Sequence, residues 1–348
     1  VHGNATNFGR KALASEWTVS PGASPYARAA MWSNFHMREL ILSEGQPIIC
    51  HDRQKFDEIY DKRVRMVSHN KITFVPKTAK TYRSIAIEPL LNGYLQKGVD
   101  QYMRSCLRRK AKIDLRYQEP NQHLASVGSL GGFNALCTID LSAASDSLTT
   151  ELVRDLVPPD WFELLNSLRS HNYVIGDSAS RRYHKFVSMG NGFCFPLETL
   201  IFASLAHACN VVNSAPGVFR VYGDDIICNQ SVALHLLEVL RWCGFRHNEE
   251  KTFIFGPFRE SCGEDWFEGE QVRPVYLDEE LGSLQSLHVL HNSSLRNRRA
   301  SLFWSHTRDL IRSLVPDRWT FVRPIAGSAD TAFTVPLDVC MQSCNVKW

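Results

Sequence analysis

The stretch that decides the fold is Val221-Tyr-Gly-Asp-Asp-Ile-Ile227, in which two adjacent carboxylates interrupt an apolar run. Gly223 and Asp224 are favoured turn residues, so the stretch predicts a tight hairpin between two short strands. Neighbouring carboxylates repel each other and raise each other's pKa unless a cation neutralises them. Mg²⁺ suits this role because it is hard, prefers oxygen ligands and is usually shared with substrate phosphates. The stretch by itself leaves open a metal site and a solvated turn.

Asp140 favours the metal site, because it too ends an apolar strand, expected at 136–141. Its carboxylate can project from the rim of the same sheet. Three convergent carboxylates can hold two metal ions roughly 3.5–4 Å apart for in-line phosphoryl displacement. Asp146 lies past the turn and could reach a sugar hydroxyl, with a helix N-cap as the alternative interpretation.

Strands and helices alternate around these carboxylates. We expect strands at 72–75, 136–141, 219–222 and 226–228, a hairpin at 173–188, and helices at 91–109, 148–156, 197–209 and 231–243. Residues 76–83 are expected to form a polar connector, and Ser231 to cap the last helix, which Gly244 ends. This order predicts an α+β fold with an antiparallel sheet flanked by helices.

The composition is that of a globular protein, with 348 residues, 44% hydrophobic and 22% charged. It excludes a disordered chain, a collagen-like repeat and a disulfide-rich miniprotein. Residues 199–219 carry no formal charge, but polar residues interrupt them, so no membrane span is expected. Ten scattered cysteines without a Cys-x-x-Cys pair indicate reduced thiols in a cytosolic setting. The chain begins at Val1, and we interpret it as a fragment of a longer protein.

Positive charge is concentrated between Lys62 and Arg116, where fourteen Lys and Arg residues face three acidic ones, a net of +11. Because the whole chain carries +3, the remainder carries −8. Basic clusters of this kind are candidate tracks for RNA phosphates, with solvated helix faces as the alternative. The clusters are Arg108-Arg109-Lys110 with Lys112, Arg181-Arg182 with Lys185, and Arg296 with Arg298-Arg299. The thirteen histidines show no metal-ligand spacing, so zinc is not expected.

Four motifs in order resemble those of the RNA-directed RNA polymerase, or replicase β subunit, of the leviviruses, the single-stranded RNA bacteriophages. They are Asp140-Leu-Ser-Ala-Ala-Ser-Asp146-Ser, Ser188-Met-Gly-Asn-Gly-Phe, Tyr222-Gly-Asp-Asp225 and Phe258-Arg-Glu-Ser-Cys-Gly263. The resemblance covers about residues 71–277, and the greater length of family members supports the interpretation as a fragment. It implies a right-hand polymerase with fingers, palm and thumb that copies a viral RNA genome.

The resemblance also implies domain boundaries. Fingers are expected at 1–135, palm at 136–157 and 188–270, a fingers insertion at 158–187 and thumb at 271–348, with the catalytic core at about 126–257. Asp140, Asp224 and Asp225 resemble the ligands of two Mg²⁺ ions, with Mn²⁺ as a substitute. Asp146 resembles the carboxylate that recognises the ribose 2′-hydroxyl, and Lys251 the lysine that protonates the pyrophosphate leaving group.

Residues 71–89 resemble the fingers segment that embraces the incoming triphosphate. Fixed cations stabilise the charge that develops on phosphoryl oxygens, and arginine offers a bidentate fork. The implied nucleotide-binding residues are Lys71, Lys77, Lys80, Arg83, Asp146 and Ser188. The implied RNA-binding residues are Gly190, Asn191 and Gly192, where glycine lets the backbone approach closely, together with Arg108, Arg109 and Lys110.

Two other functions remain open at this point. A reverse transcriptase shares the palm, but usually carries a bulky aromatic residue in the first motif, where this chain has the small residues of 142–146. A noncatalytic RNA-binding protein would keep only the basic groove, and the three carboxylates argue against it. The resemblance further implies RNA template, nascent strand and NTPs as partners, host elongation factors Tu and Ts, no membrane, and the cytoplasm of an infected bacterium.

Overall fold

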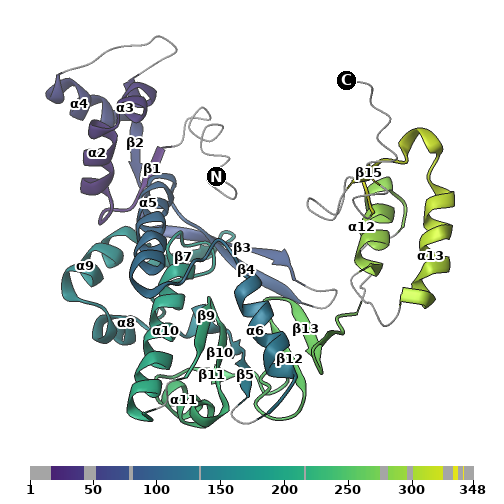
Figure 1. Cartoon of the computed structure of the whole chain (residues 1–348). Helices are drawn as coiled ribbons and strands as arrows, with labels where there is room; N and C mark the ends of the chain where they lie inside the picture. The colour runs from purple at the N-terminus through teal and green to yellow at the C-terminus, as the bar shows by residue number, and fades with distance from the viewer. Residues whose placement is uncertain are drawn as a thin grey trace. The chain divides into compact units, whose positions relative to one another are not determined.

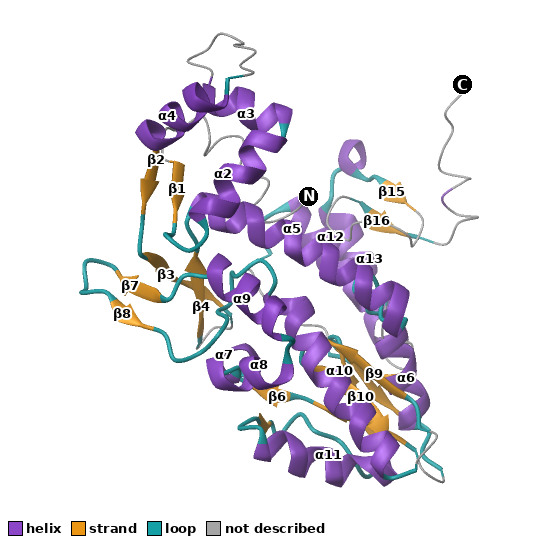
Figure 2. Ribbon diagram, turned by 90° about the vertical axis from the view of Figure 1, so that its left-hand side faces the viewer, coloured by secondary structure: helices purple, strands orange, loops and turns teal. Residues whose placement is uncertain are grey.

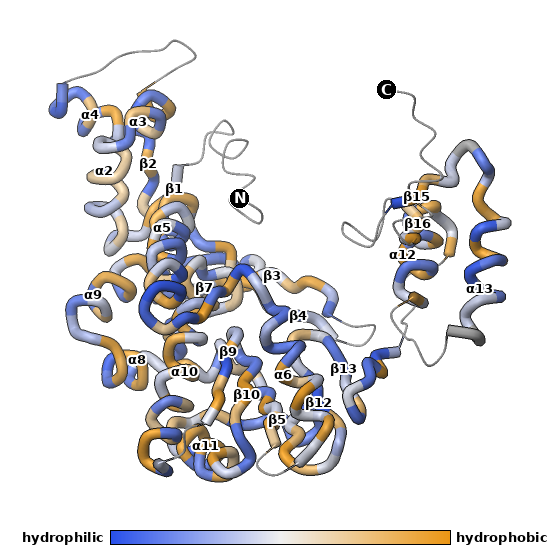
Figure 3. The backbone as a smooth tube through the Cα atoms, viewed as in Figure 1, coloured by the Kyte–Doolittle hydropathy of each residue, from blue (hydrophilic) through white to orange (hydrophobic). Residues whose placement is uncertain are grey.

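The apolar strands that lead into the carboxylates form a three-stranded sheet. In this computed structural model its order is β5 (Leu136–Ile139), β10 (Asp225–Asn229) and β9 (Phe219–Tyr222). β9 and β10 are antiparallel, and hydrophobic residues recur along the strands (Figure 3). The predicted α+β fold is therefore confirmed at this level, and so is the predicted hairpin.

The structure describes residues 17–42, 52–77, 81–132, 135–214, 217–274, 281–295, 301–323, 332–335 and 340 (Figure 1). The chain divides into two compact units, one of residues 1–121 and 137–254, the other of 122–136 and 255–348. The first unit contains the candidate site residues. Lys80 is one of the expected nucleotide-binding residues and lies outside the described residues.

Helices cover the sheet of the first unit. α10 (Cys194–Val212) packs against β9, α5 (Leu90–Cys106) and α11 (Gln230–Trp242) (Figure 2). Because α10 is apolar on nearly every side, it belongs in a protein interior. α10 is also long and apolar enough to cross a membrane by length and composition alone, although 61% of that window is buried within the protein.

A second sheet in this unit has the order β4 (Tyr82–Ile87), β3 (His69–Pro76), β7 (Asn172–Ile175) and β8 (Arg181–Arg182). β3 and β4 form an antiparallel hairpin, and β7 pairs with β3 in parallel. The predicted hairpin at 173–188 corresponds to β7 and β8. The polar connector expected at 76–83 was wrong in part, because the chain re-enters the sheet at Tyr82.

Shorter elements complete the first unit. They are β1 (Trp17–Val19), α2 (Ser24–Ser33), α3 (Phe35–Leu42), α4 (Arg53–Arg63), β2 (Val64–Met66), the π-helix η1 (Leu107–Ala111), β6 (Leu141–Ser142), α7 (Ala144–Ser147), α8 (Thr150–Leu156), α9 (Pro159–Leu168) and β11 (Arg246–His247). The cap predicted for α11 was wrong, since the helix begins one residue before Ser231 and Asn229 is its N-cap. Gly244 follows the end of that helix with a φ of 92°, as expected.

The second unit is described by itself. α6 (Glu119–Ser129) begins in the first unit and continues into this one, which also contains β12 (Phe258–Ser261), β13 (Glu264–Phe267), β14 (Glu270–Gln271), α12 (Leu284–Ser294), α13 (Ser301–Leu314), η2 (Asp317–Trp319), β15 (Val322–Arg323) and β16 (Phe333–Thr334). The motif at 258–263 lies in an antiparallel hairpin formed by β12 and β13. Arg259 on β12 is fully buried, and its guanidinium donates to the carbonyls of Leu136 at 2.6 Å and Gly256 at 2.7 Å.

Candidate active site

Two carboxylates of the predicted site, those of Asp140 and Asp225, come from adjacent strands. Asp140 directly follows the last residue of β5, and Asp225 is the first residue of β10, opposite Tyr222 on β9. The side chain of Asn121 donates to the carbonyl oxygen of Asp225 at 3.4 Å. Both carboxylates therefore stand on a rigid sheet, which fixes them better than a loop would.

The turn before Asp225 requires a glycine. Gly223 has a φ of 64°, and a Cβ there would lie 2.4 Å from Cε2 of Phe195. Its N–H donates to Oγ1 of Thr199 on α10 at 3.0 Å, while the Phe195 ring meets the edge of Tyr222 with centroids 5.0 Å apart. The turn that carries Asp224 is thus tied to α10, and only a residue without a side chain fits the space.

Asp140 is held by the segment after β11. The backbone N–H of Asn248 donates to the Asp140 carbonyl oxygen at 2.8 Å, and its side-chain Nδ2 donates to Oδ2 at 3.2 Å. Thr252 exchanges hydrogen bonds with the Asp140 backbone at 3.3 Å. Lys251, between them, is exposed, and its N–H donates to the Asn248 carbonyl oxygen at 3.1 Å. The same turn therefore orients the Asp140 carboxylate and also carries the exposed Lys251.

A buried carboxyl group on α10 lies among the site residues. Glu198 is 7% exposed, and burial raises its pKa to about 8. The negative charges of Asp224 and Asp146 add to the rise, while a hydrogen bond with Cys194 opposes it. Since these charges act on Glu198, Asp224 and Asp146 lie close enough to it to interact electrostatically.

Asp146 does not cap a helix. It lies within α7, whose N-cap is Ala143 without a side-chain cap, and its exposed carboxylate forms an ion pair with Lys185. The alternative interpretation as an N-cap is therefore wrong. Lys185 also lies 5.6 Å from the ring centre of Tyr183, which directly follows β8.

The described cations of the 71–89 segment share one face of the β3–β4 hairpin. Val75 is the partner of Arg83, and Lys71 the partner of Ile87, so Lys71 and Arg83 point to the same side because side chains alternate along each strand. Lys77 lies an even number of residues after Lys71, so its side chain is on the same side. Its N–H donates to the Thr81 carbonyl oxygen at 2.9 Å. All three cations are exposed. They form a basic face on a regular element.

The loop between Ser188 and Gly192 packs closely on that hairpin and on α5. The N–H of Ala86 donates to the Met189 carbonyl oxygen at 2.7 Å. A Cβ at Gly190 would lie 2.3 Å from the Ala86 oxygen, and one at Gly192 would lie 2.8 Å from Cβ of Gln96. The glycines permit this contact, as expected for close backbone approach. Ser188 and Asn191 are each 6% exposed and face the interior.

The expected RNA-binding residues Arg108, Arg109 and Lys110 are exposed on the π-helix η1. This helix ends at Lys112, which has a φ of 59° and whose carbonyl oxygen accepts from Arg220 at 3.5 Å. The structure thus presents these cations together on one short segment.

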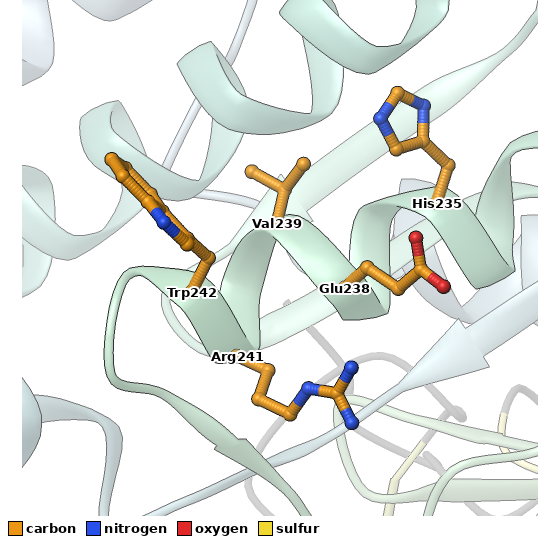
Figure 4. Close-up of a pocket in the computed structure, with 5 residues that line it drawn as sticks. All are labelled: His235, Glu238, Val239, Arg241 and Trp242. Carbon is orange, nitrogen blue, oxygen red and sulfur yellow. The ribbon is translucent and has the colours of Figure 1, made fainter.

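Oxygen ligands of this kind fit Mg²⁺ by their chemistry. Among the residues that the structure describes, however, no three His, Cys, Asp or Glu side chains gather closely enough to hold an ion by themselves. The pocket drawn in Figure 4 lies on α11, lined by His235, Glu238, Val239, Arg241 and Trp242. It contains none of the predicted site residues, and Trp242 is 87% exposed there.

Sequence reasoning missed Glu198 and Asn248. Glu198 had a detectable signal, because it is the single Asp, Glu, Lys or Arg residue in the 194–212 segment. Asn248 had none, since its role depends on a contact with a residue 108 positions away. The predicted site residues otherwise occur in the first unit, apart from Lys80, which is not described.

Comparison with known proteins confirms the resemblance drawn from the motifs. Residues 9–301 match the family described as RNA replicase, beta-chain. The chain is 42% identical over 281 residues to the RNA-directed RNA polymerase subunit beta of Enterobacteria phage SP, covering 79% of this chain and 48% of that protein. It is 39% identical over 282 residues to the RNA-directed RNA polymerase beta chain of Escherichia phage MS2, covering 81% and 48%.

A solved structure with partial similarity is described as the in situ structure of BmCPV RNA-dependent RNA polymerase at elongation state. It is 12% identical, covers 67% of this chain and 25% of its own, and has a TM-score of 0.48, which is too low to identify a shared fold. The chain spans about half the length of the curated relatives it matches. The family match covers most of the chain, and the chain therefore belongs to the RNA replicase, beta-chain family.

Proposed function

We propose that this chain carries the catalytic segment of an RNA-directed RNA polymerase that copies a viral single-stranded RNA genome. The observation that carries the proposal is the pair of adjacent strands, one ending at Asp140 and the other beginning at Asp225, within a member of the replicase family. The reaction is template-directed transfer of a nucleotidyl group from an NTP to an RNA 3′-hydroxyl, with release of pyrophosphate.

The carboxylates of Asp140 and Asp225, with help from Asp224, would hold two Mg²⁺ ions, for which Mn²⁺ could substitute. Bound metal would lower the pKa of the attacking hydroxyl and neutralise charge on the leaving group. Substrate phosphates would complete the shell of each ion, as is usual for Mg²⁺ in phosphoryl-transfer sites. Lys251 would donate a proton to the departing pyrophosphate.

The triphosphate would bind the basic face of the β3–β4 hairpin. Lys71, Lys77 and Arg83 are exposed there on one side, and Lys80 belongs to the same motif. Fixed cations of this kind stabilise the charge that develops on phosphoryl oxygens without reorganising during the reaction. Asp146, now paired with Lys185, would exchange that partner for the ribose 2′-hydroxyl.

The RNA would follow the 188–192 loop and the cations of η1. Arg108, Arg109 and Lys110 would contact phosphates without regard to sequence, as copying every sequence demands. Ser188 would help to orient the incoming nucleotide, and the glycines beside it would let the backbone approach the template pair.

The finer architecture and the assembly are also proposals. We assign fingers to 1–135 and 158–187, palm to 136–157 and 188–270, and thumb to 271–348. Because the relatives come from bacteriophages, the chain would act in the cytoplasm of an infected bacterium. The motif resemblance alone supports host elongation factors Tu and Ts as partners.

Extension of an RNA primer on an RNA template tests the activity. The purified protein should extend with NTPs and Mg²⁺, Asp225→Asn should abolish extension, and Glu238→Gln, an exposed carboxyl on α11, should not change it. Unchanged extension by Asp225→Asn would refute the metal assignment. Preference for dNTPs would identify a reverse transcriptase, and RNA binding without extension would favour a noncatalytic RNA-binding protein.

A further inference from the structure

A buried polar network links the base of the β3–β4 hairpin to the 188–192 loop. Asn70 on β3 is 1% exposed, and its Nδ2 donates to Oε1 of Glu88, just after β4, at 3.2 Å. The Glu88 carboxylate also accepts from the Ser170 hydroxyl at 2.6 Å. The hydroxyl of Tyr183 donates to Oδ1 of Asn70 at 2.8 Å. The Ser188 side chain lies beside the same phenol, and its polar contact opposes the rise that burial causes in the pKa of Tyr183. Polar side-chain contacts therefore run from the hairpin to the first residue of the loop.

The other end of the loop belongs to the same network. The N–H of Gly192 donates to Oε1 of Gln96 at 3.0 Å. The fully buried Gln96 side chain lies beside Glu88, and its polar contact opposes the rise that burial causes in the pKa of Glu88. Its Nε2 donates to the Leu168 carbonyl oxygen at 2.8 Å. Glu88 thus contacts polar side chains that lead to both ends of the loop.

Burying this polar network costs free energy that the stability of the fold does not require. Burying a carboxylate is unfavourable unless it is well hydrogen-bonded, and removing one partner leaves the others unsatisfied. An apolar core of the same shape would stabilise the hairpin as well. A polar network of this type instead specifies one relative position of the elements that it joins.

We propose that Asn70, Glu88 and Tyr183 are positioning residues that join the triphosphate-binding hairpin to the 188–192 loop, so that nucleotide binding at the hairpin orders the loop. The inference rests on the proposed function, because it takes Lys71 and Arg83 as the triphosphate contacts. Lys71 directly follows Asn70 on β3. A movement of Lys71 towards bound nucleotide would therefore move Asn70, and with it the network, directly.

Tyr183→Phe is the decisive variant. It removes only the hydroxyl that donates to Asn70 and lies beside Ser188, and it keeps the ring, which packs on Tyr173 with centroids 4.7 Å apart. Tyr173→Phe is the matched control, because Tyr173 packs on the same ring but its hydroxyl is outside the network.

Hydrogen–deuterium exchange with GTP and Mg²⁺ provides a readout that needs no catalysis. In the unaltered protein, nucleotide should slow exchange in both the 71–89 and the 188–192 peptides. In Tyr183→Phe the slowing at 71–89 should persist, while that at 188–192 should fall about tenfold, the factor expected when a buried hydrogen bond is lost. Tyr173→Phe should behave as the unaltered protein.

Steady-state extension supplies the second readout. Tyr183→Phe should raise the KM for NTP about tenfold with little change in kcat, and should add nothing to Ser188→Ala in the double variant. Full slowing at 188–192 in Tyr183→Phe, or additive effects in the double variant, would overturn the inference while leaving the proposed function intact. No slowing at 71–89 in the unaltered protein would instead refute the nucleotide site itself, and the inference with it.

Discussion

Replacing Glu198 by Gln should make folding stability less dependent on pH. In the folded chain burial raises the pKa of Glu198 from its ordinary value of 4.5 to about 8, with Asp224 and Asp146 adding to the rise. Between these two values the folded state holds a proton that the unfolded state has released. Stability therefore falls as pH rises from 4.5 towards 8, by up to about 1.4 kcal/mol per pH unit from this one group.

The magnitude follows from the same two pKa values. Between pH 5 and pH 7 this carboxyl should lower the free energy of unfolding by about 2.5 kcal/mol. Glutamine has nearly the same shape and stays neutral, so Glu198→Gln should lose this contribution. The stability of the variant relative to that of the unaltered protein should therefore rise by about 2.5 kcal/mol between pH 5 and pH 7.

Urea unfolding at pH 5, 6 and 7, in buffer without divalent metal, measures the effect. Metal is omitted because a cation near Asp224 would itself favour the charged carboxyl. Comparing the variant with the unaltered protein cancels the titration of other groups. Glu238→Gln, which removes an exposed carboxyl, is the control and should run parallel to the unaltered protein. If the free energy of unfolding of Glu198→Gln also changed with pH in parallel with that of the unaltered protein, the assignment of a neutral, buried carboxyl would be refuted.

Three further outcomes follow from the contacts described above. Gly223→Ala should lower the free energy of unfolding by more than the roughly 1–2 kcal/mol that a left-handed backbone costs, because the new Cβ would meet Phe195. Gly176 has a φ of 54° and open space around it, so Gly176→Ala should cost only that roughly 1–2 kcal/mol. Urea unfolding measures both. Asn248→Ala should raise the Mg²⁺ concentration for half-maximal extension about 10- to 100-fold, and an unchanged Mg²⁺ requirement would contradict the proposed orientation of the adjacent carboxylate. Arg259→Met should cost roughly 3 kcal/mol or more, measured by urea unfolding, because it leaves buried carbonyl oxygens without a donor; a loss below about 1 kcal/mol would contradict this.

The local elements could be predicted because they depend on short patterns. The turn at Gly223, the 173–188 hairpin and the apolar helix after Pro196 are each encoded within about twenty residues, where turn chemistry and periodicity operate. The strand at 82–87 was missed because polar residues precede it and its pairing depends on β3. Strand pairing is a tertiary contact, and propensity alone does not determine it.

The sequence predicted which residues form the candidate site, but not which residues hydrogen-bond to them and hold them in place. The order of the motifs identified Asp140, Asp146 and the Asp224–Asp225 pair, because the chemistry of phosphoryl transfer demands carboxylates. It could not identify Asn248, which reaches Asp140 across 108 residues, nor the pairing of Asp146 with Lys185 across 39. Hydrogen bonds between residues so far apart leave no periodic trace in the sequence.

The sequence by itself determined the family, the α+β class and the chemistry that the carboxylates and cations can perform. Only the tertiary structure decided the protonation of Glu198 and the link from Asn70 through Tyr183 to Ser188. The physical reason is that a pKa and a buried hydrogen bond depend on what surrounds a side chain, and those surroundings exist only after folding has removed water and brought distant segments together.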